Sequence, residues 1–110
     1  MFVLPIKRKW FFMILDGIKK EEYREIKPYY TKRFQTLGLL DENGNPTSKH
    51  AVIPFRNGYG TLVPYLFANV HLRIGTGNPE WGAEPNVKYY ILEINSIPFA
   101  NNYAVNKEGV

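Results

Sequence analysis

The chain has 110 residues, no cysteine and a formal net charge of +4. A chain of this length folds as one domain with a single core, and the lack of cysteine excludes disulfides, thiolate catalysis and cysteine-ligated zinc. A hydrophobic fraction of 45% predicts a packed domain and argues against disorder.

The charge pattern favours an anionic partner such as RNA, DNA or a nucleotide. Nine of the 14 Lys and Arg residues lie between Lys7 and Arg33. The longest apolar run, residues 10–15, is far shorter than the roughly 20 residues of a membrane-spanning helix. Basic residues at 7–9 and proline at 5 do not match a signal peptide, so we expect a cytoplasmic protein without a membrane partner.

The N-terminal half predicts two strands and two helices. Residues 2–6 form a short apolar strand, and Pro5 places it at a sheet edge because proline lacks the N–H donor. Residues 9–16 have helical hydrophobic spacing, and Gly17 is suited to end that helix. A second helix over 28–37 begins with proline, which suits the first helical turn.

Between these helices, charged and neutral residues alternate over 19–26, which predicts a strand with two different faces. One face would carry Lys20, Glu22 and Arg24, and the other Lys19, Glu21 and Tyr23.

The C-terminal half is rich in strand signals. Strands are predicted over 51–56, 63–74 and 88–97, with a long loop over 75–86 that contains glycine and proline. The apolar run in the last strand indicates burial on both faces, and a polar, frayed tail is expected over 106–110. The order strand, helix, strand, helix and then strands predicts an α+β fold, with a barrel-like sheet that carries its helices on one side.

Residues 17–24 have the spacing G-x-K-x-x-E-x-R, with Gly17, Lys19, Glu22 and Arg24 at the fixed positions. In this setting the spacing resembles the signature of the ASCH domain, a small PUA-like family associated with RNA. Residues 23–33 look like the form of this domain found in phage and prophage proteins. Four later parts of the chain look like the later strands of the family: Phe55, Gly58-Tyr59, Trp81-Gly82 and Tyr89 to Ile94. The resemblance therefore spans roughly residues 3–97.

The resemblance implies one α+β domain over 1–110, a small mixed PUA-like β-barrel with two helices in its N-terminal half and a cleft beside the motif. Family members are expected to bind RNA or nucleosides in that cleft. One bacterial branch removes the acetyl group from 4-acetylcytidine, and a ribonuclease activity is ascribed to another. The lysine of the amidohydrolase branch matches Lys19, but its threonine position holds Glu22 here.

Lys19 and Glu22 are therefore the candidate catalytic pair. A partly desolvated lysine near Arg24 would have a lowered pKa, which suits a base or nucleophile, and Glu22 could act as a general base. The alternative is a solvated strand with ion pairs that contribute about 0–1 kcal/mol each.

The candidate binding residues combine cations that contact phosphate with aromatic rings that stack on bases. Trp10 is instead expected in the core, and His50 and His71 are too far apart in sequence to predict a metal site. No cofactor is expected.

Three functions remain open: an RNA- or nucleotide-binding module, a small hydrolase of a modified nucleoside or RNA, and a phage-encoded protein-binding regulator. The candidate binding residues are Lys9, Lys19, Glu22, Arg24, Lys27, Arg56, Tyr59 and Trp81.

Overall fold

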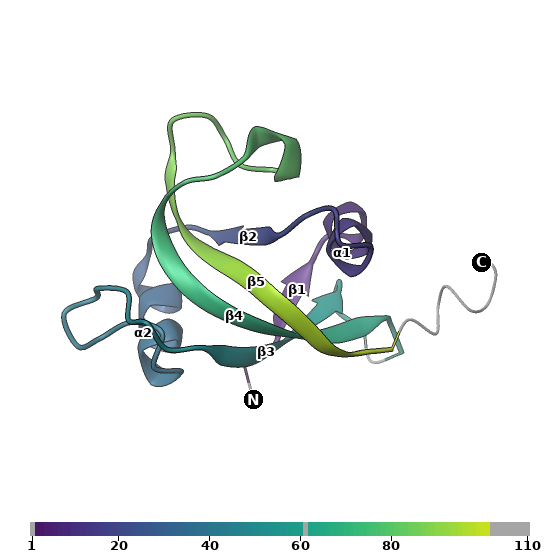
Figure 1. Cartoon of the computed structure of the whole chain (residues 1–110), viewed down its shortest axis with the longest axis horizontal. Coiled ribbons are helices and arrows are strands. Elements are labelled where there is room, and N and C mark those ends of the chain that lie inside the picture. The colour runs from purple at the N-terminus through teal and green to yellow at the C-terminus, as the bar shows by residue number, and fades with distance from the viewer. Residues whose placement is uncertain (1, 61, 102–110) are drawn as a thin grey trace.

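A computed structural model describes residues 2–60 and 62–101 and shows two α-helices beside one curved, five-stranded sheet (Figure 1). This arrangement confirms the predicted α+β class, with both α-helices in the N-terminal half. In chain order the elements are β1 (Leu4–Ile6), α1 (Arg8–Leu15), β2 (Glu21–Arg24), α2 (Pro28–Thr36), β3 (Ala51–Asn57), β4 (Tyr65–Thr76), the 3₁₀ helix η1 (Pro79–Trp81) and β5 (Lys88–Asn101).

The sheet has the strand order β1-β3-β4-β5-β2, so β1 and β2 are its two edges. β1 runs parallel to β3, and every other neighbouring pair is antiparallel. The register of β4 and β5 shifts on both sides of Asn69, and such bulges bend a strand and increase its twist. Within the described part of the chain no backbone ladder joins β1 to β2, so the sheet is mixed and curved but not closed into a barrel.

The end of α1 fixes how the chain enters β2. Gly17 has a φ of 78°, and its N–H donates to the Ile14 carbonyl oxygen at 3.0 Å. The N–H of Ile18 donates to the Met13 carbonyl oxygen at 2.9 Å, which completes the turn that commonly ends a helix at glycine. The N–H of Lys19 also reaches the Met13 carbonyl oxygen, at 3.0 Å. Lys19 is therefore held by the helix end before the strand begins.

The core lies between the helices and the inner face of the sheet. Phe11 on α1 and Phe34 on α2 are fully buried in it, and the ring of Phe34 meets that of Tyr90 edge to face at 5.5 Å. The middle of β5 is buried on both faces, as its apolar run predicted. Tyr90 and Leu92 face the main core, while Ile91 joins a smaller cluster with Tyr23 and Ala83.

The clearest differences from the predicted bounds are in three strands. The strand predicted over 19–26 is limited to Glu21–Arg24, because the turn after α1 takes up the preceding residues. The strand predicted from residue 63 begins at Tyr65, directly after Pro64, and the last strand continues through Pro98 to Asn101. The predicted long loop contains η1, and the tail predicted over 106–110 lies outside the described residues.

Candidate functional site

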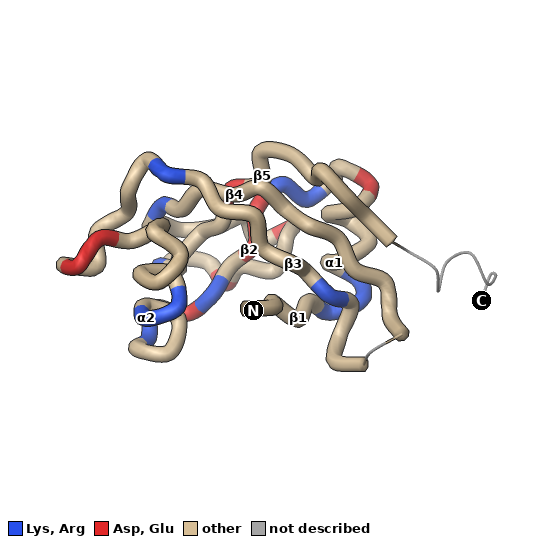
Figure 2. Tube along the Cα trace, turned by 90° about the horizontal axis from the view of Figure 1, so that it is seen from below, with Lys and Arg blue, Asp and Glu red and all other residues tan. Residues whose placement is uncertain are grey.

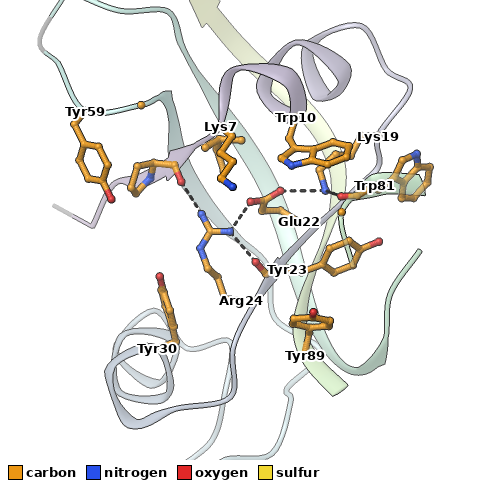
Figure 3. Close-up of a pocket in the computed structure, with 14 residues that line it drawn as sticks. Lys7, Trp10, Lys19, Glu22, Tyr23, Arg24, Tyr30, Tyr59, Trp81 and Tyr89 are labelled. Atoms are coloured by element: carbon orange, nitrogen blue, oxygen red, sulfur yellow. Dashed lines mark hydrogen bonds and ion pairs between the residues drawn. The ribbon is translucent and has the colours of Figure 1, made fainter. Parts of the chain in front are cut away.

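A cavity of about 470 Å³ opens between the edge strands β1 and β2 (Figure 3). Its walls come from both edges, from the start of α1, from α2 and from the segments near residues 58 and 81. The segments that meet here are distant in sequence, and several contribute a charged or aromatic side chain. Those side chains belong to Lys7, Trp10, Lys19, Glu22, Tyr23, Arg24, Tyr30, Tyr59, Trp81 and Tyr89.

Lys19 lies at one end of the cavity and is only 2% exposed. Its Nζ donates to the carbonyl oxygens of Glu21 at 2.6 Å and Trp81 at 2.8 Å, and it lies 3.1 Å from Glu22 Oε1. An ammonium group has three hydrogens, and these three acceptors match them. The ring of Tyr23 lies 4.5 Å from Nζ and adds a cation–π contact. The geometry therefore fits a charged, fully hydrogen-bonded ammonium.

Glu22 connects Lys19 to Arg24. One carboxylate oxygen pairs with Lys19, and the other accepts a short hydrogen bond from Arg24 NH1. Arg24 also donates to the Tyr23 carbonyl oxygen at 2.7 Å and, from NH2, to the Pro5 carbonyl oxygen at 2.6 Å. Pro5 belongs to β1 and Arg24 to β2, so this side chain bridges the two sheet edges where no backbone ladder does. Partners among the described residues take three of the five N–H groups of Arg24, which leaves donors for a ligand.

Burial is the largest influence on the pKa of Lys19 and lowers it below its usual value, while the neighbouring Glu22 carboxylate opposes this shift. Among the described residues that line the cavity there are three cations, Lys7, Lys19 and Arg24, and one carboxylate, Glu22. The balance of charge is positive, which favours an anionic or electron-rich ligand.

Aromatic rings form much of the remaining wall. Trp10 is half-buried, packs against the main core and also lines the cavity, so the prediction that it is purely a core residue was incomplete. Tyr59 is 83% exposed at the other end of the cavity from Lys19 (Figure 3). Tyr30 lies below it, with its ring stacked on that of Phe34 at 6.0 Å. The cavity thus combines aromatic rings that pack against the core with one solvent-exposed ring.

The outer face of the sheet carries a separate charged network. Glu21 accepts a hydrogen bond from the Tyr23 hydroxyl at 2.8 Å and pairs with Arg73 at 3.0 Å. Arg73 also contacts Glu93, which lies 2.7 Å from His71.

The described residues contain no cluster of three or more His, Asp and Glu side chains that could bind a metal ion. None of the helices described is long and apolar enough to cross a membrane.

The structure brings together five of the predicted site residues: Lys19, Glu22, Arg24, Tyr59 and Trp81. The strand face predicted for Lys19 was wrong. Its side chain pairs with Glu22, which was predicted on the opposite face. The alternation of faces does not apply to Lys19 because it precedes the strand.

The other three predicted residues lie outside this cavity. Lys9 is exposed on α1, with its Nζ 4.6 Å from the Trp10 ring. Lys27 lines a neighbouring hollow, and Arg56 lies on β3 opposite Pro5. The Pro5 carbonyl and the Tyr89 ring are also parts of the site, and the sequence did not predict either of them. Tyr89 begins the apolar run of β5, and such a run predicts burial in the core, not a place beside a cavity.

Comparisons of the chain with protein-family models, with curated proteins and with solved structures found no match.

Proposed function

We propose that this chain is an ASCH-like domain that binds RNA or a nucleotide in the cavity between β1 and β2. The observation that carries the proposal is the convergence of Lys19, Glu22 and Arg24 in one concave, aromatic-lined cavity. Arg24 keeps N–H donors that no described residue takes, and each Glu22 oxygen has a second lone pair, so the cluster offers both a donor and an acceptor to the edge of a nucleobase. Aromatic walls suit stacking, and a volume of about 470 Å³ lies in the range of small-molecule sites.

The distribution of charge around the cavity supports the same proposal. Lys and Arg residues gather along α1 and α2, on either side of β1 (Figure 2). Phosphate groups outside the cavity would meet these cations, and Lys7 is exposed on the cavity wall itself. A protein-binding regulator would require neither the concave shape nor this charge distribution.

The proposal includes a PUA-like barrel. In this barrel no backbone ladder among the described residues joins β1 to β2, and the Arg24 side chain instead connects the two edges through its hydrogen bond to the Pro5 carbonyl oxygen. A closure made by a side chain would leave an opening beside the motif, and the cavity occupies that position.

A second candidate is hydrolysis of a modified nucleoside, favoured by the buried Lys19 in the cavity wall. Two features weaken it. Burial lowers the pKa of Lys19, but its Nζ already contacts three acceptors, and it would have to give up one of them before a lone pair could reach a substrate. Both oxygens of Glu22 are already held by cations, one by Lys19 and the other by Arg24, so neither is placed to take a proton from water. Incubation with 4-acetylcytidine tests this candidate: release of acetate from the nucleoside by the wild type would favour hydrolysis over binding, and no release would reject hydrolysis of this substrate.

Fluorescence anisotropy with a labelled, mixed-sequence, single-stranded RNA of about 12 nucleotides tests RNA binding. We expect affinity to fall between about 50 and about 300 mM salt, because phosphate contacts release counterions. Lys7→Ala should weaken binding and reduce the salt slope by about one. Lys49→Ala is the matched control. Lys49 is also an exposed lysine, but it precedes the start of β3, whereas the cavity lies beside the end of that strand. Absence of RNA and nucleotide binding at the lowest salt would reject the proposed function.

A further inference from the structure

A second hollow of about 520 Å³ lies beside the cavity and shares Pro5, Tyr30 and Tyr59 with it. We propose that this hollow holds the next nucleotide of a single-stranded RNA. The ligand of the proposed function, on which this inference rests, would then be an RNA strand of at least two nucleotides and not a free nucleoside. Because the two hollows have a common wall, they would hold adjacent units of one strand.

The rings around the second hollow are placed for stacking. Tyr29 is 51% exposed and Tyr59 is 83% exposed, so neither ring is used mainly to fill the core. The guanidinium carbon of Arg33 lies 3.9 Å from the centre of the Tyr29 ring. Tyrosine rings and guanidinium planes are the groups on which proteins stack unpaired RNA bases. Tyr30 is fixed between both hollows by its contact with Phe34, so it offers a rigid divider.

The charge of the second hollow differs from that of the cavity. Lys27 is the one charged side chain among the described residues that line it, and no carboxylate is among them. The Lys27 side chain is 50% exposed, and its Nζ lies 5.5 Å from the centre of the Tyr30 ring. The same Nζ pairs at 3.2 Å with the carboxylate of Glu25, which is exposed and does not line the hollow. A cation beside exposed rings suits a phosphate linked to a base. An uncharged nucleoside would use only the rings.

Two exposed aromatic residues give a matched test. Tyr29 lines only the second hollow, whereas Phe99 lies on β5 outside both hollows and is 46% exposed. We expect Tyr29→Ala to weaken binding of the labelled RNA of about 12 nucleotides by about tenfold or more, because one stacked base is lost. Phe99→Ala should bind this RNA as the wild type does. Circular dichroism of both variants checks that the fold is kept.

Competition against the labelled RNA supplies the second measurement. The competitors are the four ribonucleoside 5′-monophosphates and mixed ribodinucleotides. We expect the dinucleotides to compete at concentrations at least about tenfold lower, because they occupy both hollows. If mononucleotides compete equally well and Tyr29→Ala binds like Phe99→Ala, the second site is refuted while the proposed function stands. If the wild type binds neither RNA nor nucleotides, the proposed function itself fails.

Discussion

Replacing Lys19 with methionine tests whether the charged cluster is a buried structural unit. The substitution keeps an unbranched side chain of similar length but removes all three hydrogen-bond donors. Glu22 Oε1 and the carbonyl oxygens of Glu21 and Trp81 then lose a partner in a site where the Lys19 side chain is 1% exposed.

The expected cost follows from burial. Breaking a buried ion pair by removing one partner costs about 3–5 kcal/mol of unfolding free energy, whereas a surface pair contributes about 0–1 kcal/mol. The side chains of Lys19 and Glu22 are 1% and 8% exposed, so the larger range applies. We expect a loss of about 4 kcal/mol, a large part of the total stability of a domain of this size. In a double variant with Glu22→Gln, the loss should be smaller than the sum of the two single losses by about 1–3 kcal/mol.

The assay is urea unfolding at neutral pH, followed by the fluorescence of the two tryptophans. The chain offers a matched control in Lys27→Met. Lys27 lies 3.2 Å from Glu25, nearly the same separation as the 3.1 Å between Lys19 and Glu22, but its side chain is 50% exposed. Lys27→Met should cost under about 1 kcal/mol. Equal losses for the two lysine variants would show that the cluster is an ordinary surface ion pair and refute the reasoning.

Other substitutions test the walls of the cavity. Trp10→Ala should lower the free energy of unfolding by about 2–3 kcal/mol, less than for a fully buried tryptophan, and should also weaken RNA binding; thermal melting and anisotropy measure the two effects. Gly77→Ala should lower the melting temperature, with a cost of about 1–3 kcal/mol, because a Cβ there would lie 2.5 Å from the Tyr23 ring. Burial raises the pKa of Tyr23 above its ordinary value of 10.0, so the unfolded chain loses this proton first as pH rises above that value. Wild-type stability should therefore fall above pH 10 by up to about 1.4 kcal/mol per pH unit from this group, and Tyr23→Phe should remove that part of the slope in urea unfolding measured across the alkaline range.

The sequence predicted the order of the elements because local rules determine it. Pro28 begins α2, and Gly17 ends α1 with the expected positive φ. The burial of β5 also followed from its composition. Each of these signals depends on residues that are neighbours in the chain.

The site was less predictable because its contacts cross the chain. Lys19 and the Trp81 carbonyl are 62 residues apart, and Arg24 and the Pro5 carbonyl are 19 apart. Every residue has a backbone carbonyl, so the residue type does not indicate which carbonyl accepts a hydrogen bond. The motif therefore identifies the cations but not their backbone partners. The wrong face predicted for Lys19 has a local cause: the helix-ending turn shortened the strand, and strict alternation no longer applied to the residue before it.

The charged cluster links the chemistry of the cavity to the shape of the sheet. Glu22 holds Lys19 on one side and Arg24 on the other, and Arg24 holds the carbonyl of Pro5 on the facing edge strand. The groups that would recognise a ligand are therefore also the groups that keep the two edges together. Removing any of them changes the geometry of the opening and its charge at once, so lost binding in such variants would not separate recognition from folding. Residues on the rim, Lys7 for charge and Tyr29 for stacking, separate the two effects because both are exposed and lie outside the cluster.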